Sequence, residues 1–264
     1  MVDIRTLGVI GAGQMGRGIA QVAAQSGYPV MLFDVHEKGL ESGFEFIKNQ
    51  LDKGVNKGKW QQDHSADSLN NISKSLDMSD LRDCDLVIEA ATENKPIKFE
   101  IFKNLDNLIK DDAILATNTS SISITEIAAV TDRPDKIAGM HFMNPVPVMK
   151  LVEGIRGLET SEETFQTVEA VALKMGKTFV KANDVPGFAV NRILMPMINE
   201  AIYALYEGVA DAKDIDLAMK LGCHQPMGPL ELADFIGLDT CLSIMEVLHD
   251  GLGDTKYRPC PLLK

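Results

Sequence analysis

The sequence is poor in the features that mark disulfide-bonded, metal-binding and membrane-spanning proteins. Its four cysteines, Cys84, Cys223, Cys241 and Cys260, are widely separated, form no C-x-x-C pair and have no histidine at metal-ligand spacing. We interpret them as free thiols in a reducing compartment and expect no metal site. The chain has no run of about 18 apolar residues that could span a membrane, and its N-terminus lacks the basic-then-apolar order of a signal peptide. A cytoplasmic location without membrane contact is therefore predicted.

Basic residues are fewer than acidic ones, 26 against 38, and the formal net charge is -12 at pH 7. Nucleic-acid binding requires a basic surface for phosphate contacts, so the charge argues against a nucleic-acid partner. The hydrophobic content of 45% and charged content of 24% are those of an ordinary globular protein. A length of 264 residues allows one large domain or two unequal ones.

The clearest local pattern surrounds the glycine-rich turn at residues 11–16. It lies between an apolar strand at 6–10 and a helix through 19–24, and a second apolar strand at 29–33 ends in Asp34. Dinucleotide-binding sites typically have this order of a strand, the motif G-x-G-x-x-G, a helix, a second strand and an acidic residue. The motif G-x-G-x-x-G by itself could also be a glycine-rich turn without function. The complete order of strand, turn, helix, strand and acid favours a dinucleotide-binding site.

Each residue of this pattern has a physical role in such a site. Gly11 permits the tight turn, Gly13 lets the backbone approach a pyrophosphate, and Gly16 lets helix and strand pack closely. The helix N-terminus offers unpaired N–H groups to the anion. Asp34 would accept hydrogen bonds from the adenosine ribose and repel a 2′-phosphate, so NAD is predicted as the cofactor rather than NADP.

An amphipathic helix is predicted at 37–51, where apolar residues recur every three or four positions. It runs into a lysine-rich segment that ends at Trp60 and contains Lys48, Lys53, Lys57 and Lys59. On so acidic a protein, this positive cluster is a candidate site for a phosphorylated ligand. A solvated helix end explains the same residues equally well.

Alternating strands and helices predict a Rossmann-type, doubly wound and mostly parallel α/β sheet. Nearly all-apolar runs at 86–90 and 113–117 are predicted to be strands buried on both faces, with a helix at 96–109 between them. Ligands in such sheets bind at the carboxyl ends of the strands. Polar residues follow both runs, at 93–94 and 118–121, and helix capping is the alternative explanation for the second group.

The stretch 139–153 is the strongest candidate for catalytic chemistry. It places His141 at the end of one apolar run and Glu153 at the end of the next, with Pro145 and Pro147 in the turn between them. Two short strands joined by this proline-stiffened loop would bring the histidine and the carboxylate side by side. A histidine whose ring is oriented by a carboxylate is typical of a general acid/base. The alternative is a hydrogen-bonded core histidine.

The break at residues 183–187 predicts a domain boundary, with residues 1–184 forming the sheet domain and 185–264 an all-α domain. Helical periodicity predicts three helices in the second domain, at 188–206, 212–221 and 230–248. Pro196 lies inside the first of them and predicts a kink. A wide apolar stripe on so few helices favours burial against a second copy, and hence a homodimer; packing on the first domain is the alternative.

Five stretches match the motifs of one protein family in order, namely 9–16, 118–121, 141–153, 186–192 and 226–231. Through them essentially the whole chain resembles the short-chain L-3-hydroxyacyl-CoA dehydrogenase family, and its bacterial 3-hydroxybutyryl-CoA dehydrogenases most of all. The resemblance implies NAD-dependent interconversion of an L-3-hydroxyacyl-CoA, such as 3-hydroxybutyryl-CoA, and the 3-ketoacyl-CoA, such as acetoacetyl-CoA. Family members usually continue with a tail rich in glycine and aromatic residues, so we expect either a shortened sequence or a helical domain without part of its usual packing.

The family's roles transfer to individual positions of this sequence. His141 matches the catalytic histidine, Glu153 the glutamate that orients it, and Ser120 and Asn191 the residues that hydrogen-bond the substrate. Lys57 matches a lysine that contacts coenzyme A. The residues implied to contact NAD are Gly11, Gly13, Gln14, Met15, Gly16, Asp34, Glu93, Lys98, Asn118, Ser120 and Asn144.

Two other functions are compatible with the same architecture. One is a dehydrogenase of a different β-hydroxy acid, because the fold alone does not determine the substrate. The other is a non-catalytic NAD-binding or structural protein of the same fold. The presence of His141, Glu153, Ser120 and Asn191 together argues against the second.

Overall fold

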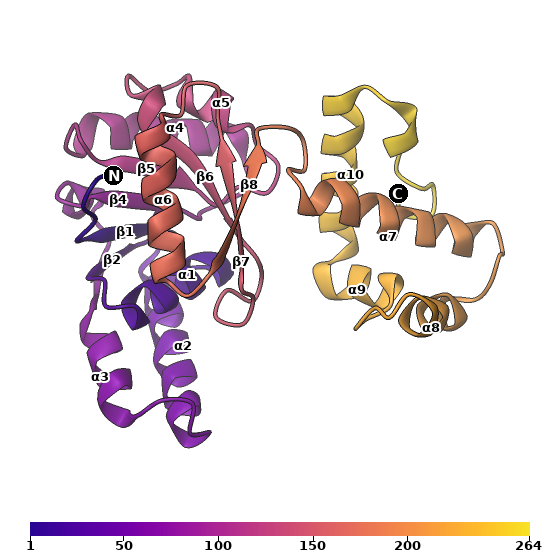
Figure 1. Ribbon diagram of the computed structural model, residues 1–264, viewed down its shortest axis with the longest axis horizontal. Coiled ribbons are helices and arrows are strands. Elements are labelled where there is room, and N and C mark those ends of the chain that lie inside the picture. Colours follow the sequence, from indigo (N-terminus) through magenta and orange to yellow (C-terminus); the bar gives the residue numbers. More distant parts are fainter. The chain divides into compact units, whose positions relative to one another are not determined.

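The computed structural model describes all 264 residues, and the chain divides into two compact units, Met1–Asp184 and Val185–Lys264. The first unit contains a β-sheet with its helices, and the second contains helices and no strand (Figure 1). None of these helices combines the length and the apolar character needed to cross a membrane.

The first unit is built on one eight-stranded sheet with the strand order β3-β2-β1-β4-β5-β6-β7-β8. Its strands are β1 (Leu7–Ile10), β2 (Val30–Phe33), β3 (Ile72–Ser75), β4 (Leu86–Glu89), β5 (Ile114–Thr117), β6 (Ile137–Phe142), β7 (Leu151–Arg156) and β8 (Thr178–Asn183). Neighbouring strands are parallel except β6 and β7, which are antiparallel. The predicted mostly parallel α/β sheet is confirmed.

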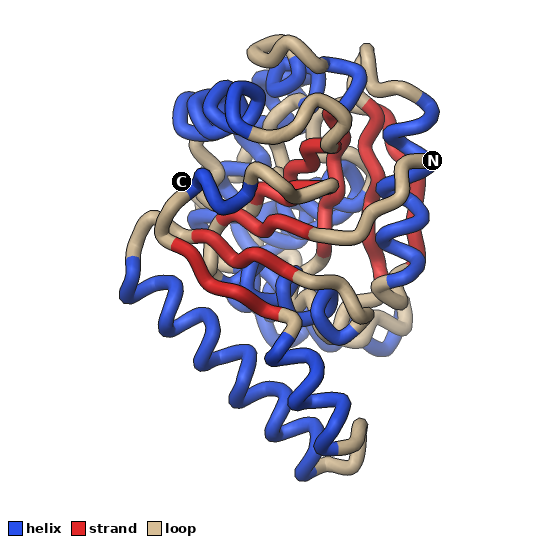
Figure 2. Tube along the Cα trace, turned by 90° about the vertical axis from the view of Figure 1, so that its left-hand side faces the viewer, coloured by secondary structure: helices blue, strands red, loops and turns tan.

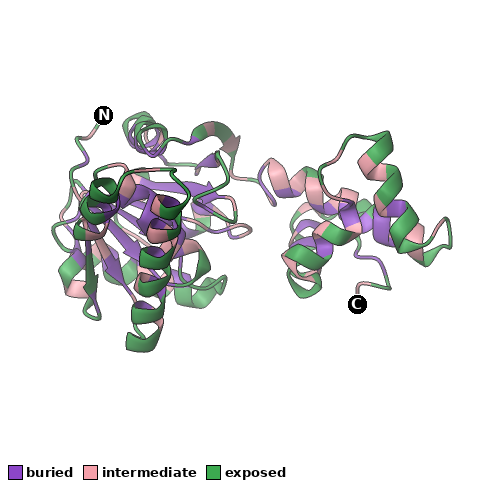
Figure 3. Ribbon diagram, turned by 90° about the horizontal axis from the view of Figure 1, so that it is seen from below, coloured by how far each residue is buried: buried purple, intermediate pink, exposed green.

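Helices cover both faces of this sheet (Figure 2). They are α1 (Gln14–Gln25), α2 (Glu37–Asn56), α3 (Gln62–Asn70), α4 (Lys95–Leu108), α5 (Ile124–Ala128) and α6 (Glu162–Lys174). The helices α1, α2, α4, α5 and α6 bury apolar residues and leave their outer sides exposed, whereas the polar helix α3 buries only Ser65 and Ser68. The central strands are buried (Figure 3). Burial on both faces explains why these strands are almost continuously apolar in sequence.

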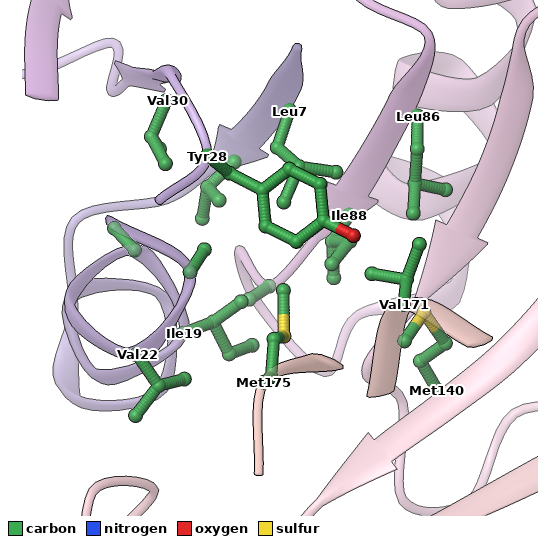
Figure 4. Packing of buried hydrophobic residues seen from close by; sticks show 14 of the residues in the cluster. Leu7, Ile19, Val22, Tyr28, Val30, Leu86, Ile88, Met140, Val171 and Met175 are labelled. Atoms are coloured by element: carbon green, nitrogen blue, oxygen red, sulfur yellow. The ribbon is translucent and has the colours of Figure 1, made fainter. Parts of the chain in front are cut away.

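One large apolar core lies between the sheet and the helices α1 and α6. Ile19 of α1 and Val171 of α6 converge there on Leu7, Leu86 and other strand residues (Figure 4). All four of these side chains are at most 2% exposed. Burying an aliphatic side chain of this size contributes about 1.5–3 kcal/mol, so this layer is a main source of the unit's stability.

The lysine-rich segment lies in a helical hairpin formed by α2 and α3. Helix α2 continues past the predicted end at residue 51 to Asn56, and Lys57 is its exposed C-cap. Trp60 closes the hairpin, since its indole Nε1 donates to the carbonyl of Leu51 at 3.0 Å. Neither α3 nor β3 is predicted from the sequence, because α3 is mostly polar and β3 is a four-residue edge strand with two exposed residues.

The second unit consists of α7 (Val190–Tyr206), α8 (Ala212–Gly222), α9 (Pro229–Ile236) and α10 (Leu238–Leu252). Its core contains Met195 and Ile198 of α7 and Leu248 of α10. The prediction of a single helix at 230–248 is wrong. Gly237, with φ 102°, separates α9 from α10, because this backbone conformation cannot continue an α-helix.

A crowded glycine of β7 gives a test of the packing in the first unit. A Cβ added at Gly154 would lie 1.8 Å from Cζ of Phe179, whose ring packs edge-on against Phe165 with centroids 5.6 Å apart. We therefore expect Gly154→Ala to lower the free energy of unfolding by about 1–3 kcal/mol, the usual cost of overpacking. Urea unfolding followed by the fluorescence of Trp60, the only tryptophan, measures this change in the same unit.

Gly39→Ala is the matched control in helix α2. A Cβ at Gly39 would meet its nearest neighbour, an Asp34 oxygen, at 3.6 Å, an ordinary contact, and alanine favours helix. The control should unfold at the wild-type urea concentration or slightly above it. Equal midpoints for Gly154→Ala and the wild type would contradict the packing described for β7 and β8.

Candidate active site

The antiparallel pair β6–β7 brings together the two residues singled out in the stretch 139–153. His141 lies directly opposite Glu153 in the strand register. Nδ1 of His141 is 2.8 Å from Oε2 of Glu153, and the two residues are 7% and 0% exposed. This confirms the predicted proximity. An ionised carboxylate that accepts from Nδ1 fixes the imidazole tautomer, so Nε2 is the nitrogen that would exchange a proton with a ligand.

Asn118 connects the end of β5 to the strand that carries His141. Its Oδ1 accepts a hydrogen bond from the backbone N–H of Phe142 at 2.9 Å. The amide side chain therefore holds the ends of two neighbouring strands together at the edge where ligands bind in such sheets. Its contact with NAD stays a prediction.

Glu93 organises the polar loop that contains Ser120. Its Oε1 accepts hydrogen bonds at 2.7–3.1 Å from the hydroxyls of Thr119, Ser120 and Ser121 and from the N–H groups of the last two. Burial acts to raise the pKa of Glu93, but the positive charge of Lys98 and these hydrogen bonds together hold it below its usual value. A carboxylate held ionised in this way fixes the position of the Ser120 hydroxyl.

Glu89 is a buried charged residue that the sequence pattern did not predict. It is fully buried at the end of β4, and both of its carboxylate oxygens accept from the Nζ of Lys98, at 2.8 and 2.7 Å. The hydroxyl of Thr117 donates to the same carboxylate at 2.8 Å. The available signal was a single acid at the end of the apolar run Leu-Val-Ile-Glu.

The network explains why Lys98 is only 2% exposed. Its ammonium lies between Glu89 and Glu93, with the Oε2 of Glu93 at 3.6 Å. Lys98 therefore holds two acids at the carboxyl edge of the sheet, and the predicted contact of Lys98 with NAD remains a prediction.

The glycine turn has the close approaches that a dinucleotide site requires. Gly11 has φ 94°, and a Cβ there would lie 2.7 Å from the carbonyl oxygen of Ala90. A Cβ at Gly16 would lie 1.8 Å from the carbonyl oxygen of Gly11, whereas one at Gly13 would have open space around it. No side chain caps α1 at Gly13. The first N–H groups of the helix, beginning at Gln14 and Met15, are thus suited to a pyrophosphate.

Asp34 stands between β2 and the glycine turn. Its Oδ2 accepts from the N–H of Ala12 at 2.8 Å, and its Oδ1 accepts from the N–H of His36 at 2.9 Å. Beside it is a cavity of about 510 Å³ whose lining includes Ile10, Gly11, Gly13, Asp34, Val35, Met78, Ala90, Ile97 and Ile101. The mostly apolar walls, with the Asp34 carboxylate beside the glycine turn, fit the adenosine part of a dinucleotide.

Asn144 links the loop between β6 and β7 to the start of α1. The Nε2 of Gln14 donates to its Oδ1 at 3.1 Å. Residues implied to contact NAD from distant parts of the sequence are therefore neighbours in the first unit.

Two further residues, Lys57 and Asn191, are predicted to contact the substrate. Lys57 is exposed in the hairpin of α2 and α3, and Asn191 is a buried residue in the first turn of α7, in the second unit. Their roles stay predictions. The chain contains no cluster of three or more histidine, cysteine, aspartate or glutamate side chains able to hold a metal ion.

Two family models match the chain almost from end to end. Residues 6–185 match the description "3-hydroxyacyl-CoA dehydrogenase, NAD binding domain", and residues 187–264 match "3-hydroxyacyl-CoA dehydrogenase, C-terminal domain". These two segments agree with the two units of the structure to within two residues at the boundary.

Relatives with similar sequences and structures share the full length of the chain. It is 59% identical over 263 residues to a probable 3-hydroxybutyryl-CoA dehydrogenase of Bacillus subtilis, covering 100% of this chain and 92% of the relative. It is 56% identical over 260 residues to 3-hydroxybutyryl-CoA dehydrogenase of Bradyrhizobium diazoefficiens, covering 98% and 89%. The crystal structure of (S)-3-hydroxybutyryl-CoA dehydrogenase from Ralstonia eutropha superposes with a TM-score of 0.97 at 50% identity, covering 99% and 92%.

The buried pair of Glu89 and Lys98 gives a test of the charge network. Glu89→Leu would leave the Lys98 ammonium without its nearest carboxylate, so we expect the free energy of unfolding to fall by about 3–5 kcal/mol. The double variant Glu89→Leu/Lys98→Met removes both charges and should recover most of this loss. Urea unfolding with Trp60 fluorescence measures both. A double variant that is no more stable than Glu89→Leu would contradict the pairing.

Proposed function

The chain belongs to the 3-hydroxyacyl-CoA dehydrogenase family, and from this premise we propose that it interconverts L-3-hydroxybutyryl-CoA and acetoacetyl-CoA with NAD. The observation that carries the proposal is the buried pair of His141 and Glu153. It lies at the end of a strand in the same unit as the glycine turn and the cavity beside Asp34. The names of the full-length relatives support the four-carbon substrate.

The histidine supplies the proton transfer that the reaction needs. In oxidation, Nε2 of neutral His141 takes the proton of the 3-hydroxyl group while the hydride leaves C3, and in reduction the protonated ring returns it. NAD, held at the glycine turn, would supply the hydride acceptor for oxidation and, as NADH, the hydride donor for reduction. Glu153 holds the ring through Nδ1 and keeps its neutral form in the required tautomer. A positioned general acid/base of this kind accelerates a reaction by roughly 10²–10⁴.

Polar groups around the pair would hold the substrate. The hydroxyl of Ser120 donates to Glu93 at 3.1 Å, and on binding its one O–H would turn to the reacting oxygen of the substrate. The backbone N–H of Ser120 also donates to Glu93, at 2.8 Å, and would keep the residue in place. Asn191 would hydrogen-bond the substrate, and the exposed ammonium of Lys57 would pair with a phosphate of coenzyme A. These assignments carry the family's roles to matching positions of this chain.

A homodimer that forms through the helical unit completes the proposal. Large apolar side chains are exposed on this unit, with Ile193 and Val209 each 72%, Leu221 77% and Phe235 63% accessible. Exposed apolar surface of this extent is characteristic of protein interfaces. A second copy of the chain would cover it.

His141→Gln tests the catalytic assignment. We expect acetoacetyl-CoA-dependent loss of NADH absorbance in the wild type, and a fall in kcat by at least roughly 100-fold in the variant because the proton donor is gone. The Kd for NADH should stay near the wild-type value, since the ring is predicted to serve the substrate.

His249→Gln is the matched control for this experiment. His249 also stands beside a carboxylate, with its Nδ1 3.2 Å from Oδ1 of Asp250, but its side chain is 39% exposed. This variant should turn over at the wild-type rate. Near-normal activity of His141→Gln would refute the catalytic role, and a wild type that reduces free acetoacetate as well as its thioester would point to another β-hydroxy acid.

Asp34→Ala tests the cofactor preference. Removing the carboxylate removes the repulsion of a 2′-phosphate, so the ratio of kcat/KM for NADH to that for NADPH should fall by about ten-fold or more, equivalent to about 1.4 kcal/mol. Asp3→Ala, which alters an exposed carboxylate near the N-terminus, should leave the ratio unchanged. An unaltered ratio in Asp34→Ala would mean that another residue discriminates between the cofactors.

A further inference from the structure

Lys177, in the turn between α6 and β8, is a buried cation whose position the proposed reaction does not explain. It is 8% exposed, and its Nζ donates to the backbone carbonyls of Val146 and Met149 at 2.5 and 2.9 Å. Both carbonyls belong to the loop at residues 143–150 that joins β6 to β7. The lysine therefore attaches the start of β8 to the loop between the strands of His141 and Glu153.

The loop is folded so that its carbonyls converge on one donor. The N–H groups of Val148 and Met149 both donate to the carbonyl of Pro145 at 2.9 Å, which closes a turn. The carbonyls of Val146 and Met149 then meet the ammonium of Lys177. Hydrogen bonds with a charged donor are about twice as strong as neutral ones. Burial lowers the pKa of Lys177, and placing a charge here is costly unless its hydrogen bonds are made.

The opposite side of the loop rests on α1. Val146 is 2% exposed, and a Cβ added at Gly18 of α1 would lie only 2.9 Å from the Cβ of Val146. Asn144, in the same loop, accepts from the side chain of Gln14 at the first position of α1. The loop is thus held between the ammonium of Lys177 and the N-terminal half of α1.

We propose that Lys177 is a positioning residue for the cofactor. By holding the carbonyls of Val146 and Met149, it keeps Asn144 beside the N-terminus of α1, where the dinucleotide would bind. Lys177 acts through the loop and contacts neither the cofactor nor the substrate. The inference rests on the proposed function, because it takes the cofactor to be NAD bound at the glycine turn.

Lys177→Met tests this role, since methionine keeps an apolar stem and removes the ammonium. Loss of two charge-assisted hydrogen bonds should raise the Kd for NADH by about ten-fold. At saturating NADH, kcat should change much less, because the pair of His141 and Glu153 remains. Amide hydrogen exchange in residues 143–150 should become faster. NADH fluorescence titration, steady-state kinetics and exchange measured by mass spectrometry give the three values.

Lys181→Met is the matched control. Lys181 lies nearby on β8, but its side chain is 59% exposed and pairs with Glu169 at 2.8 Å. This variant should leave the Kd for NADH and the exchange of the loop unchanged. Lower stability of Lys177→Met with an unchanged Kd for NADH would overturn the proposal, because it would show a purely structural lysine.

Gly18→Ala perturbs the loop from the side of α1, opposite Lys177. This variant keeps the proposal testable if Lys177→Met does not fold. The added methyl group would press on Val146, so the Kd for NADH should rise here too, and an unchanged value would overturn the proposal. If the wild type binds NADH but does not reduce acetoacetyl-CoA, the proposed reaction fails while the titration and exchange still test Lys177. If the wild type does not bind NADH, the cofactor assignment fails, and Lys177 then has no cofactor to position.

Discussion

The antiparallel register of β6 and β7 is the constraint on which the candidate site depends. Side chains alternate between the two faces of a strand, so a slip of one residue would send Glu153 to the face opposite His141. In the observed register the two residues are direct partners, and their side chains meet at 2.8 Å. Every other strand pair in the sheet is parallel. The return of the chain through one short loop is what creates the pair.

The loop between β6 and β7 links this register to the dinucleotide turn. Its Val146 packs against Gly18, and its Asn144 accepts a hydrogen bond from Gln14. Lys177 donates a hydrogen bond to the loop backbone. A loop of this kind usually has few tertiary restraints. Here three separate contacts place it, so the histidine strand and the N-terminus of α1 keep a defined geometry relative to each other.

A network of charges lies at the carboxyl edge of the same sheet, with Glu89 and Lys98 buried and Glu93 exposed. Glu89 and Glu93 are both ion-paired with Lys98, and Glu93 also gathers the hydrogen-bond donors of residues 119–121. Removing charges from water is costly unless they are paired and hydrogen-bonded. Here side chains from β4, α4 and β5 supply the ion pairs and hydrogen bonds that offset this cost. The same network orders the loop of Ser120.

The sequence by itself determined the features that follow from local patterns. The glycine turn, the apolar strands and the acid at Asp34 follow from backbone sterics and from burial on both faces, and these act within a few residues. The proximity of His141 and Glu153 was also predictable, because one proline-containing turn joins their strands. Local periodicity failed at Gly237, where an apolar pattern continues across a backbone conformation that ends the helix.

Only the tertiary structure decided which distant groups meet. Glu89 ends an ordinary apolar strand in sequence, and its pairing with Lys98 depends on how α4 packs against the sheet. Lys177 is one of 26 lysines and arginines, and nothing in its neighbours along the chain indicates that two carbonyls about 30 residues earlier accept its hydrogen bonds. The physical reason is that a charged side chain is exposed by default, and only the packing of other segments over it makes burial and a precise partner necessary.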